Sequence, residues 1–235
     1  MISDVDLIFV RENTEDVYKG LEFAIGDTTL CLRVITRKAC ERIAKCAFEM
    51  ARLRNGKKKV TAIHKANVMR VTDGLFASVC REVSKQYPDI TFNELYVDAA
   101  SMRLIKAPQE FDVLCTCNMF GDILSDEAAQ LVGGLGMAPG ANLGDNFGIF
   151  EPIHGSAPDI AGMQLANPIS MILASKMMLD WLGKQHQDPE CTAGGKAIEN
   201  AVLKILSKRL TVPDLGGNVT TQRMGDAIAI EINGS

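Results

Sequence analysis

The stretch Asn118–Glu127 (Asn-Met-Phe-Gly-Asp-Ile-Leu-Ser-Asp-Glu) decides how the rest of the chain is interpreted. It follows an apolar run, 112–117, that predicts a buried strand, and it opens a segment with the apolar spacing of a helix. Asp122 and Asp126 are four residues apart, so a helix puts both carboxylates on one face. A divalent cation such as Mg²⁺, which one or two carboxylates usually hold, would remove their repulsion. The alternative is a solvated acidic helix start, where aspartate interacts favourably with the helix dipole.

Length and composition restrict the class of protein. The 235 residues are 47% hydrophobic and 23% charged, which is enough apolar side chain for one large or two small globular domains. A net charge of -4 argues against nucleic acid as a partner. No apolar run reaches the roughly 18 residues of a membrane-spanning helix, and the first residues lack the pattern of a signal or transit segment. We therefore expect no membrane partner.

The chain has seven cysteines, an odd number, and most of them lie in apolar helix or strand patterns. This predicts buried, reduced thiols and a reducing compartment, either the cytoplasm or the mitochondrial matrix. Cys115 and Cys117 alternate within one predicted strand, so their thiols point the same way. A zinc site is not expected there, because no second cysteine pair or nearby histidine accompanies them.

Apolar runs and amphipathic segments alternate before residue 133. Strands are expected at 6–10, 60–64, 91–97 and 112–117, and helices at 36–54, 72–86, 99–105 and from 118, while 29–35 is β-prone. This alternation predicts an α/β sheet. In open α/β sheets ligands bind at the carboxyl ends of the strands.

Polar residues stand at four of these strand ends, namely Arg11, Lys65, Asp98 and Asp122, with Tyr18 in the loop after the first strand. Together they form a set suited to metal-assisted proton chemistry. Each also has an ordinary explanation: Arg11 paired with neighbouring acids, Tyr18 as an exposed loop aromatic, and Lys65 as a surface lysine.

The alternation of strand and helix patterns ends at residue 133. A glycine-rich crossing at 133–142 precedes a polar loop at 151–162, and helices are expected at 168–182, 190–208 and 221–232. Neither a G-x-G-x-x-G fingerprint nor a Walker A motif is present, so neither a Rossmann nucleotide site nor a P-loop is indicated.

With these motifs in view, the sequence resembles the β-decarboxylating dehydrogenases, which include the isocitrate, homoisocitrate, 3-isopropylmalate and tartrate/malate enzymes. It looks most like NAD-dependent isocitrate dehydrogenase. The likeness covers nearly the whole chain and rests on 118–126 as the metal motif, 10–20 as the substrate loop and 151–168 as the nucleotide loop.

The resemblance implies an α/β, two-domain fold that is not a Rossmann fold. Residues 1–133 would form the smaller, dimerisation domain with the metal and substrate residues. Residues 134–235 would form the C-terminal half of the large nucleotide-binding domain. The N-terminal half of that large domain is expected to be absent from this chain.

The resemblance also implies a role for individual residues. Tyr18 and Lys65 would be the acid/base pair, and Arg11 and Asn67 would bind the substrate. The metal, Mg²⁺ or Mn²⁺, would be held by three carboxylates: Asp98, Asp122 and Asp126. The NAD-binding positions would be Glu151, His154, Gly155, Ser156, Ala157, Asp159, Ile160 and Asn167.

The expected choice between NAD and NADP rests on Asp159. A carboxylate there would accept hydrogen bonds from the ribose hydroxyls and repel a 2′-phosphate, which favours NAD over NADP. The alternative is that Asp159 only caps a turn after Pro158.

The implied reaction is the oxidative decarboxylation of a 2-hydroxy acid with a 3-carboxylate, and isocitrate, converted to 2-oxoglutarate as in the tricarboxylic acid cycle, is the expected substrate. That choice rests on the loop 12–16, which resembles the isocitrate type. Homoisocitrate, 3-isopropylmalate and tartrate/malate remain alternatives, as do a non-catalytic regulatory subunit and a metal-dependent hydrolase without nucleotide. Lys65 and Asp98 would reach into a partner subunit's site, which implies a homodimer or a related heteromer with shared active sites.

Overall fold

The chain divides between residues 131 and 132 into two compact units. The computed structural model describes residues 5–234. The sequence analysis placed the boundary after residue 133, two residues further along. Each unit has its own buried apolar core, so each is described by itself.

The first unit is built on a four-stranded parallel sheet, which confirms the expected α/β class. Its strands are β1 (Ile8–Arg11), β6 (Val113–Thr116), β4 (Lys59–His64) and β5 (Thr91–Tyr96), in that spatial order. Because all four run the same way, their carboxyl ends meet at one edge. β1 and β6 are adjacent although a hundred residues separate them, which strand patterns alone do not predict.

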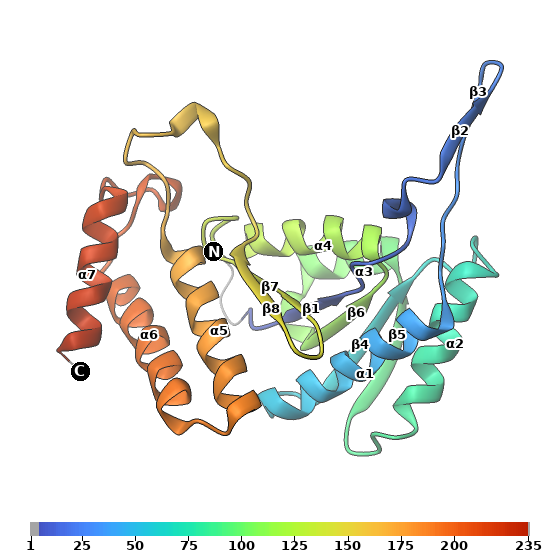
Figure 1. The fold of residues 1–235 in the computed structure, drawn as a ribbon, viewed down its shortest axis with the longest axis horizontal. Coiled ribbons are helices and arrows are strands. Elements are labelled where there is room, and N and C mark those ends of the chain that lie inside the picture. The colour runs from blue at the N-terminus through green and yellow to red at the C-terminus, as the bar shows by residue number, and fades with distance from the viewer. Residues whose placement is uncertain (1–4, 235) are drawn as a thin grey trace. The chain divides into compact units, whose positions relative to one another are not determined.

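Two helices cover each face of this sheet (Figure 1). α1 (Arg37–Arg54) and α2 (Thr72–Ser84) pack on one face, and α3 (Val97–Lys106) and α4 (Asn118–Leu131) pack on the other. Successive strand residues point to opposite faces. In β4, Val60 therefore belongs to the core under α1 and α2, whereas Ile63 belongs to the core under α3 and α4.

Local signals explain where α1 begins and ends. The Thr36 hydroxyl accepts a hydrogen bond from the Ala39 amide, and Asn55 adopts the left-handed conformation that ends many helices. The predicted helix 36–54 is confirmed. The other predicted helices of this unit are also confirmed, and their bounds differ from the predicted ones by at most two residues.

An antiparallel hairpin extends away from the sheet (Figure 1), formed by β2 (Glu22–Ile25) and β3 (Thr28–Cys31). The β-prone stretch 29–35 is partly a strand. Its first three residues lie in β3 and pair with β2, which the sequence analysis missed, and Val34 forms an isolated bridge with Asp16. Every residue of the two strands is exposed, so the hairpin buries no face and leaves little hydrophobic periodicity in the sequence. Gly26, at a φ of 59°, supplies the left-handed residue in its turn.

The second unit is mainly helical. α5 (Ile169–His186), α6 (Pro189–Ser207) and α7 (Thr221–Asn233) confirm the three predicted helices and enclose a core that includes Ile169, Met224 and Ile228. A second hairpin, β7 (Pro139–Leu143) and β8 (Gly148–Pro152), packs on α5. Its strands fall in and after the glycine-rich crossing and were not predicted.

Short 3₁₀ turns complete the two units: η1 (Val17–Lys19), η2 (Pro108–Glu110), η3 (Pro158–Ile160) and η4 (Pro213–Leu215). The cysteines are free thiols, and four of them are buried in the first unit. Burial raises the pKa of Cys40 to about 12, so this thiol stays protonated and inert at neutral pH.

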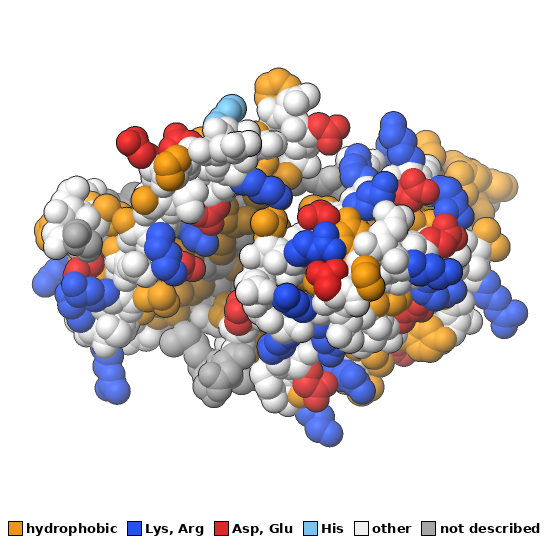
Figure 2. Space-filling model, turned by 90° about the horizontal axis from the view of Figure 1, so that it is seen from below, with side chains coloured by type: hydrophobic (Ala, Val, Ile, Leu, Met, Phe, Trp, Pro, Cys, Tyr) orange, Lys and Arg blue, Asp and Glu red, His pale blue; other side chains and the backbone are white. Residues whose placement is uncertain are grey.

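The surface bears on the expected partners. Within residues 5–234 no helix combines the length and apolar character needed to cross a membrane. On the face drawn in Figure 2, basic and acidic side chains are interspersed. The absence of a nucleic-acid partner stays a prediction.

Candidate active site

The carboxyl edge of the parallel sheet carries the polar residues singled out from the sequence. Arg11 is the last residue of β1, and Lys65 directly follows β4. Asp98 is the second residue of α3, after β5, and Asp122 lies one turn into α4, after β6. Each of the four strands therefore delivers one of them to the same edge.

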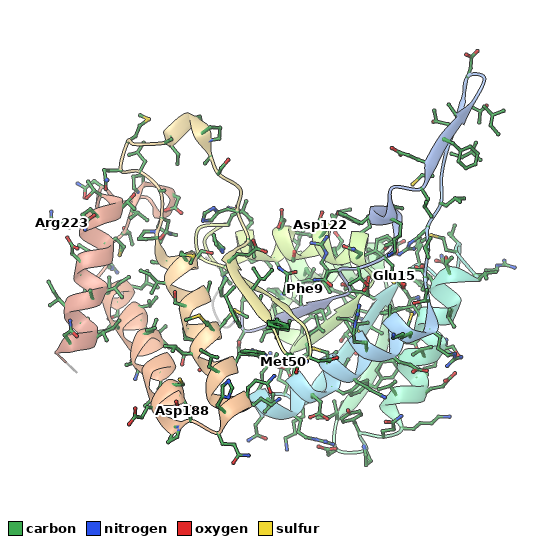
Figure 3. The ribbon with its side chains drawn as sticks, in the orientation of Figure 1. Phe9, Glu15, Met50, Asp122, Asp188 and Arg223 are labelled. Atoms are coloured by element: carbon green, nitrogen blue, oxygen red, sulfur yellow. The ribbon has the colours of Figure 1, made fainter. Side chains whose placement is uncertain are left out.

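Arg11, Tyr18, Asn118 and Asp122 form one hydrogen-bonded cluster. Arg11 donates from Nη1 to Oδ1 of Asp122 at 2.5 Å, and from Nε and Nη2 to Oδ1 of Asn118 at 2.9 and 2.6 Å. The Tyr18 hydroxyl donates to Oδ2 of Asp122 at 2.6 Å, and the guanidinium lies 5.3 Å from the centre of the Tyr18 ring. Figure 3 marks Asp122 on α4. Arg11, Tyr18 and Asp122 were singled out from the sequence, but their hydrogen bonds to one another and the anchoring of Arg11 by Asn118 were not predicted.

Gly121 makes this cluster sterically possible. A Cβ at this position would lie 2.6 Å from Cγ of Arg11 and closer still to Oγ1 of Thr116. The Arg11 side chain therefore crosses the start of α4 through space that only glycine leaves open. In the Gly-Asp pair of the sequence motif, the glycine therefore lets Arg11 approach α4 closely, and the aspartate supplies the carboxylate that Arg11 contacts.

The environment of Tyr18 suits a proton donor. Its hydrogen bond to the Asp122 carboxylate, followed by partial burial, raises the pKa of the phenol above its ordinary value of 10.0. The ring is half exposed, at 53%, so the hydroxyl stands at the surface of the unit. A neutral phenol held against a carboxylate can give up its proton to a reacting carbon and be recharged from solvent.

Lys65 and Asp98 form a separate pair. The Lys65 Nζ donates to Oδ2 of Asp98 at 2.7 Å, and this contact lowers the pKa of the Asp98 carboxyl. Asp98 is therefore ionised at neutral pH. Asn67 lies in the turn between β4 and α2 with its side chain exposed.

Within residues 5–234 of one chain the three predicted metal ligands do not come together, and the prediction that Asp98 reaches into a partner subunit's site stays untested. Among residues 5–234 no three acidic, histidine or cysteine side chains are grouped closely enough to hold a metal. Asp122 and Asp126 share one face of α4, and both reach solvent. Two such carboxylates fit Mg²⁺ or Mn²⁺ when water, substrate or a second chain supplies the remaining oxygens.

The acidic loop after β1 is turned inward. Glu12 accepts hydrogen bonds from the Thr14 amide and from Arg42, and Glu15 accepts two from Thr36. These glutamates are 4% exposed (Figure 3 labels Glu15). Asn13 and Thr14 of the same loop are exposed, so its likeness to the isocitrate type stays an untested guide to the substrate.

The sequence analysis missed the residues behind the site. Arg33 lies buried between Asp16 and Asp73, and its fork contacts both carboxylates. One signal was available: Arg33 is the lone charge in the run Cys31–Ile35 (Cys-Leu-Arg-Val-Ile). A cationic side chain in such an apolar run becomes buried only if acidic side chains pair with it.

The expected nucleotide residues lie in the second unit. Glu151, on β8, accepts a hydrogen bond from Asn142 at 2.7 Å. Asp159 lies in the exposed turn η3 after Ala157, which has a positive φ of 42°. The exposed stretch 155–159 leaves backbone and carboxylate groups open to a ligand. His154, Gly155, Ser156 and Ile160 lie in the same loop, where the Nδ1 atom of His154 is 2.9 Å from the carbonyl oxygen of Gly155.

Asn167 differs from the other nucleotide positions because it is buried. Its Oδ1 accepts from the Ile169 amide at the start of α5, and its Nδ2 donates to Asp214 at 3.1 Å. The side-chain amide is thus used within the protein. A contact of Asn167 with the adenine stays a prediction.

Comparisons with known proteins identify a family that the chain matches. A family model described as isocitrate/isopropylmalate dehydrogenase matches residues 1–228. The chain is 54% identical over 225 residues to a 3-isopropylmalate dehydrogenase of Archaeoglobus fulgidus, covering 96% of this chain and 67% of the relative. It is 50% identical over 225 residues to a homoisocitrate dehydrogenase of Methanocaldococcus jannaschii, covering 96% and 62%.

A solved structure extends the likeness to the fold. The crystal structure of isocitrate dehydrogenase from Methylococcus capsulatus superposes with a TM-score of 0.91 at 46% sequence identity, covering 98% of this chain and 68% of that one. The chain thus spans about two thirds of the length of the relatives it matches.

Proposed function

This chain belongs to the isocitrate/isopropylmalate dehydrogenase family, and on that premise we propose that it carries out the NAD-dependent oxidative decarboxylation of a 2-hydroxy acid with a carboxylate on its third carbon. The observation that carries the proposal is the placement of a neutral phenol, an arginine and a carboxylate in one cluster at the carboxyl edge of the sheet.

The residues suggest how the reaction proceeds. Arg11 would bind a substrate carboxylate, and Lys65, directly or through water and an aspartate, would take the proton of the 2-hydroxyl. NAD, when bound, would accept the hydride from the second carbon. The 3-carboxylate is then β to a ketone and departs as CO₂, which leaves an enolate. Tyr18 donates its proton to the third carbon of that enolate, and the ketone re-forms. A divalent cation held by Asp122 and Asp126, with Asp98 from another copy, would polarise the substrate oxygens and stabilise developing negative charge.

The substituent on the third carbon sets the identity of the substrate. The relatives named above are called 3-isopropylmalate, homoisocitrate and isocitrate dehydrogenases, so their names favour no single substituent. Glu12 and Glu15 of the loop that favoured isocitrate are buried, and isocitrate is one candidate among these.

A substrate panel tests the reaction. NADH formation at 340 nm, with Mg²⁺ or Mn²⁺, should be measured on isocitrate, homoisocitrate, 3-isopropylmalate and tartrate. We expect turnover with at least one acid and none with its analogue that lacks the 2-hydroxyl. Absence of NADH formation with every acid, in a preparation that binds Mn²⁺, would contradict the proposal.

NAD is the proposed cofactor because Asp159 is an exposed carboxylate in the loop that resembles the nucleotide loop. Replacing Asp159 by lysine and Ile160 by tyrosine should shift preference toward NADP by about tenfold or more, since each charge-assisted contact contributes roughly 1.5–3 kcal/mol. A wild-type preference for NADP would remove this argument.

We further propose that two copies share their active sites. Two features support this: the Lys65–Asp98 pair is separate from the Asp122 cluster, and the exposed hairpin β2–β3 presents apolar side chains such as Phe23 and Ile25. Mixing inactive Tyr18→Phe and Lys65→Met variants after subunit exchange should restore about a quarter of wild-type activity, because half of randomly formed dimers are mixed and each has one intact site. No recovery, with exchange verified by mass spectrometry, would mean that each chain supplies its own complete site.

A further inference from the structure

Arg33 is the most deeply buried arginine in an ion pair of the first unit, with a side chain only 9% exposed. It donates to Asp16 through Nε and Nη2 at 2.5 and 3.0 Å, and to Oδ1 of Asp73 through Nη1 at 2.5 Å. Both aspartates are fully buried. The guanidinium also lies 4.7 Å from the centre of the Phe120 ring. A buried charge with this many partners holds its geometry firmly.

Asp16 connects Arg33 to the elements that carry Tyr18 and Asp122. Its Oδ1 accepts from the Val17 amide at 2.9 Å and so caps the short turn η1, on which Tyr18 stands. Its Oδ2 accepts from the Met119 amide at the start of α4. Asp16 also has a φ of 76°, a conformation costly for a residue with a side chain, which persists only when its surroundings fix it.

Asp73 connects the same guanidinium to Lys65. Its Oδ2 accepts from the Lys65 backbone amide at 2.6 Å, directly after β4. Burial raises the pKa of the Asp73 carboxyl, so its ionised form depends on the cation and the amide beside it. Removal of that cation would loosen the point at which the Lys65 side chain leaves the sheet.

We propose that Arg33 is a positioning residue that holds the two proton-transfer groups, Tyr18 and Lys65, in their working places through Asp16 and Asp73. This inference rests on the proposed function for what those groups do. The placement itself is a property of the folded chain and can be measured without turnover. Lysine cannot replace Arg33 here, because only the planar fork contacts both carboxylates at once.

Amide hydrogen exchange, followed residue by residue by NMR, provides the test. The Val17 and Met119 amides donate to Asp16, and the Lys65 amide donates to Asp73. In Arg33→Lys these three amides should exchange about tenfold faster or more, because both carboxylates lose the fork that holds them.

Arg54→Lys is the matched control. Arg54 also bridges two aspartates, Asp6 and Asp112, and is 17% exposed, but it lies at the opposite edge of the sheet. This variant should lose stability in the same way and speed exchange of the Lys59 amide, which donates to Asp112, while the Val17, Met119 and Lys65 amides stay protected. Unchanged exchange of those three amides in Arg33→Lys would overturn the proposal, as would equally fast exchange of them in Arg54→Lys.

A pair of isosteric variants keeps the test decisive if Arg33→Lys fails to fold. Asp16→Asn should speed exchange of the Val17 amide, whereas Asp73→Asn should speed exchange of the Lys65 amide, because Asp16 holds η1 and Asp73 holds the end of β4. The opposite pattern would contradict the proposal. In turnover, Arg33→Lys should lower kcat by roughly tenfold to a hundredfold with little change in KM for substrate. Faster exchange in Arg33→Lys without any turnover in the wild type would leave Arg33 in its positioning role and refute only the proposed reaction.

Discussion

Two arginines, each between two aspartates, lie at opposite edges of the same parallel sheet and have different surroundings. Arg54 ends α1 and contacts Asp112, whose second oxygen accepts from the Lys59 amide at the first residue of β4. Arg33, at the other edge, contacts Asp16 and Asp73, which hold the segments bearing Tyr18 and Lys65. The chemistry of the two clusters is alike, but only the second touches candidate functional groups.

Buried polar groups have different roles at the two edges of the sheet. At the amino edge they close the ends of strands and fasten a helix, so their loss should appear as lost stability. At the carboxyl edge they also aim side chains at a reacting molecule, so their loss should appear as lost rate. Mutations at the two edges can separate these roles.

The largest effect on stability is expected at the amino edge. Asp112→Ala leaves Arg54 without its buried partner and frees the Lys59 amide, which should cost about 3–5 kcal/mol of unfolding free energy. Urea denaturation measures this cost. Asp89→Ala, which removes an exposed partner of Arg52, is the control and should cost less than about 1 kcal/mol. Equal costs for the two variants would show that the Arg54 cluster is not a buried anchor.

At the carboxyl edge the largest effect should be on rate. Asp122→Asn removes the carboxylate that contacts Arg11 and Tyr18 and faces the proposed cation. It should lower turnover by more than about 100-fold, since even residues behind a metal ligand contribute 10–100-fold. Calorimetry should show weaker Mn²⁺ binding. Because Asp122 is half exposed, stability should change by less than about 1 kcal/mol. Unchanged Mn²⁺ affinity would remove Asp122 from the metal site.

A smaller effect is expected where the Arg11 side chain crosses α4. Gly121→Ala places a methyl group against Arg11 and Thr116, and overpacking of this kind costs roughly 1–3 kcal/mol. Gly74→Ala, in the open surroundings of α2, is the matched control and should stabilise the protein by up to about 1 kcal/mol. Thermal unfolding of both variants tests this. Stabilisation by Gly121→Ala would mean that Arg11 does not cross there.

Much of the fold followed from the sequence because local chemistry determines it. Local residues mark three such features without reference to the rest of the chain: the start of α1 at Thr36, its end at Asn55, and the buried apolar run of β6. The position of β6 between β1 and β4 could not be predicted, since strand order depends on contacts between distant segments. The hairpin β7–β8 was missed because its glycine- and proline-rich sequence resembles a loop.

The candidate site was predictable to the extent that its residues stand at strand ends. Arg11, Tyr18 and Asp122 were singled out for that reason, and the structure brings them together. Arg33 and Asp73 were missed because their role arises only when two loops and a helix converge, and no spacing in the sequence records that convergence. Asp98 was grouped with Asp122 by resemblance, yet within one chain it pairs with Lys65.

The central claim, that the Tyr18 cluster and the Lys65–Asp98 pair carry different proton transfers, can be tested by measuring two reactions on two variants. One assay follows overall decarboxylating turnover, and the other follows reduction of the 2-keto, 3-carboxy intermediate by NADH. Tyr18→Phe should slow the first far more than the second, because the phenol is needed only after CO₂ has left. Lys65→Met should slow both. Equal and mild effects of both variants in both assays would contradict the account.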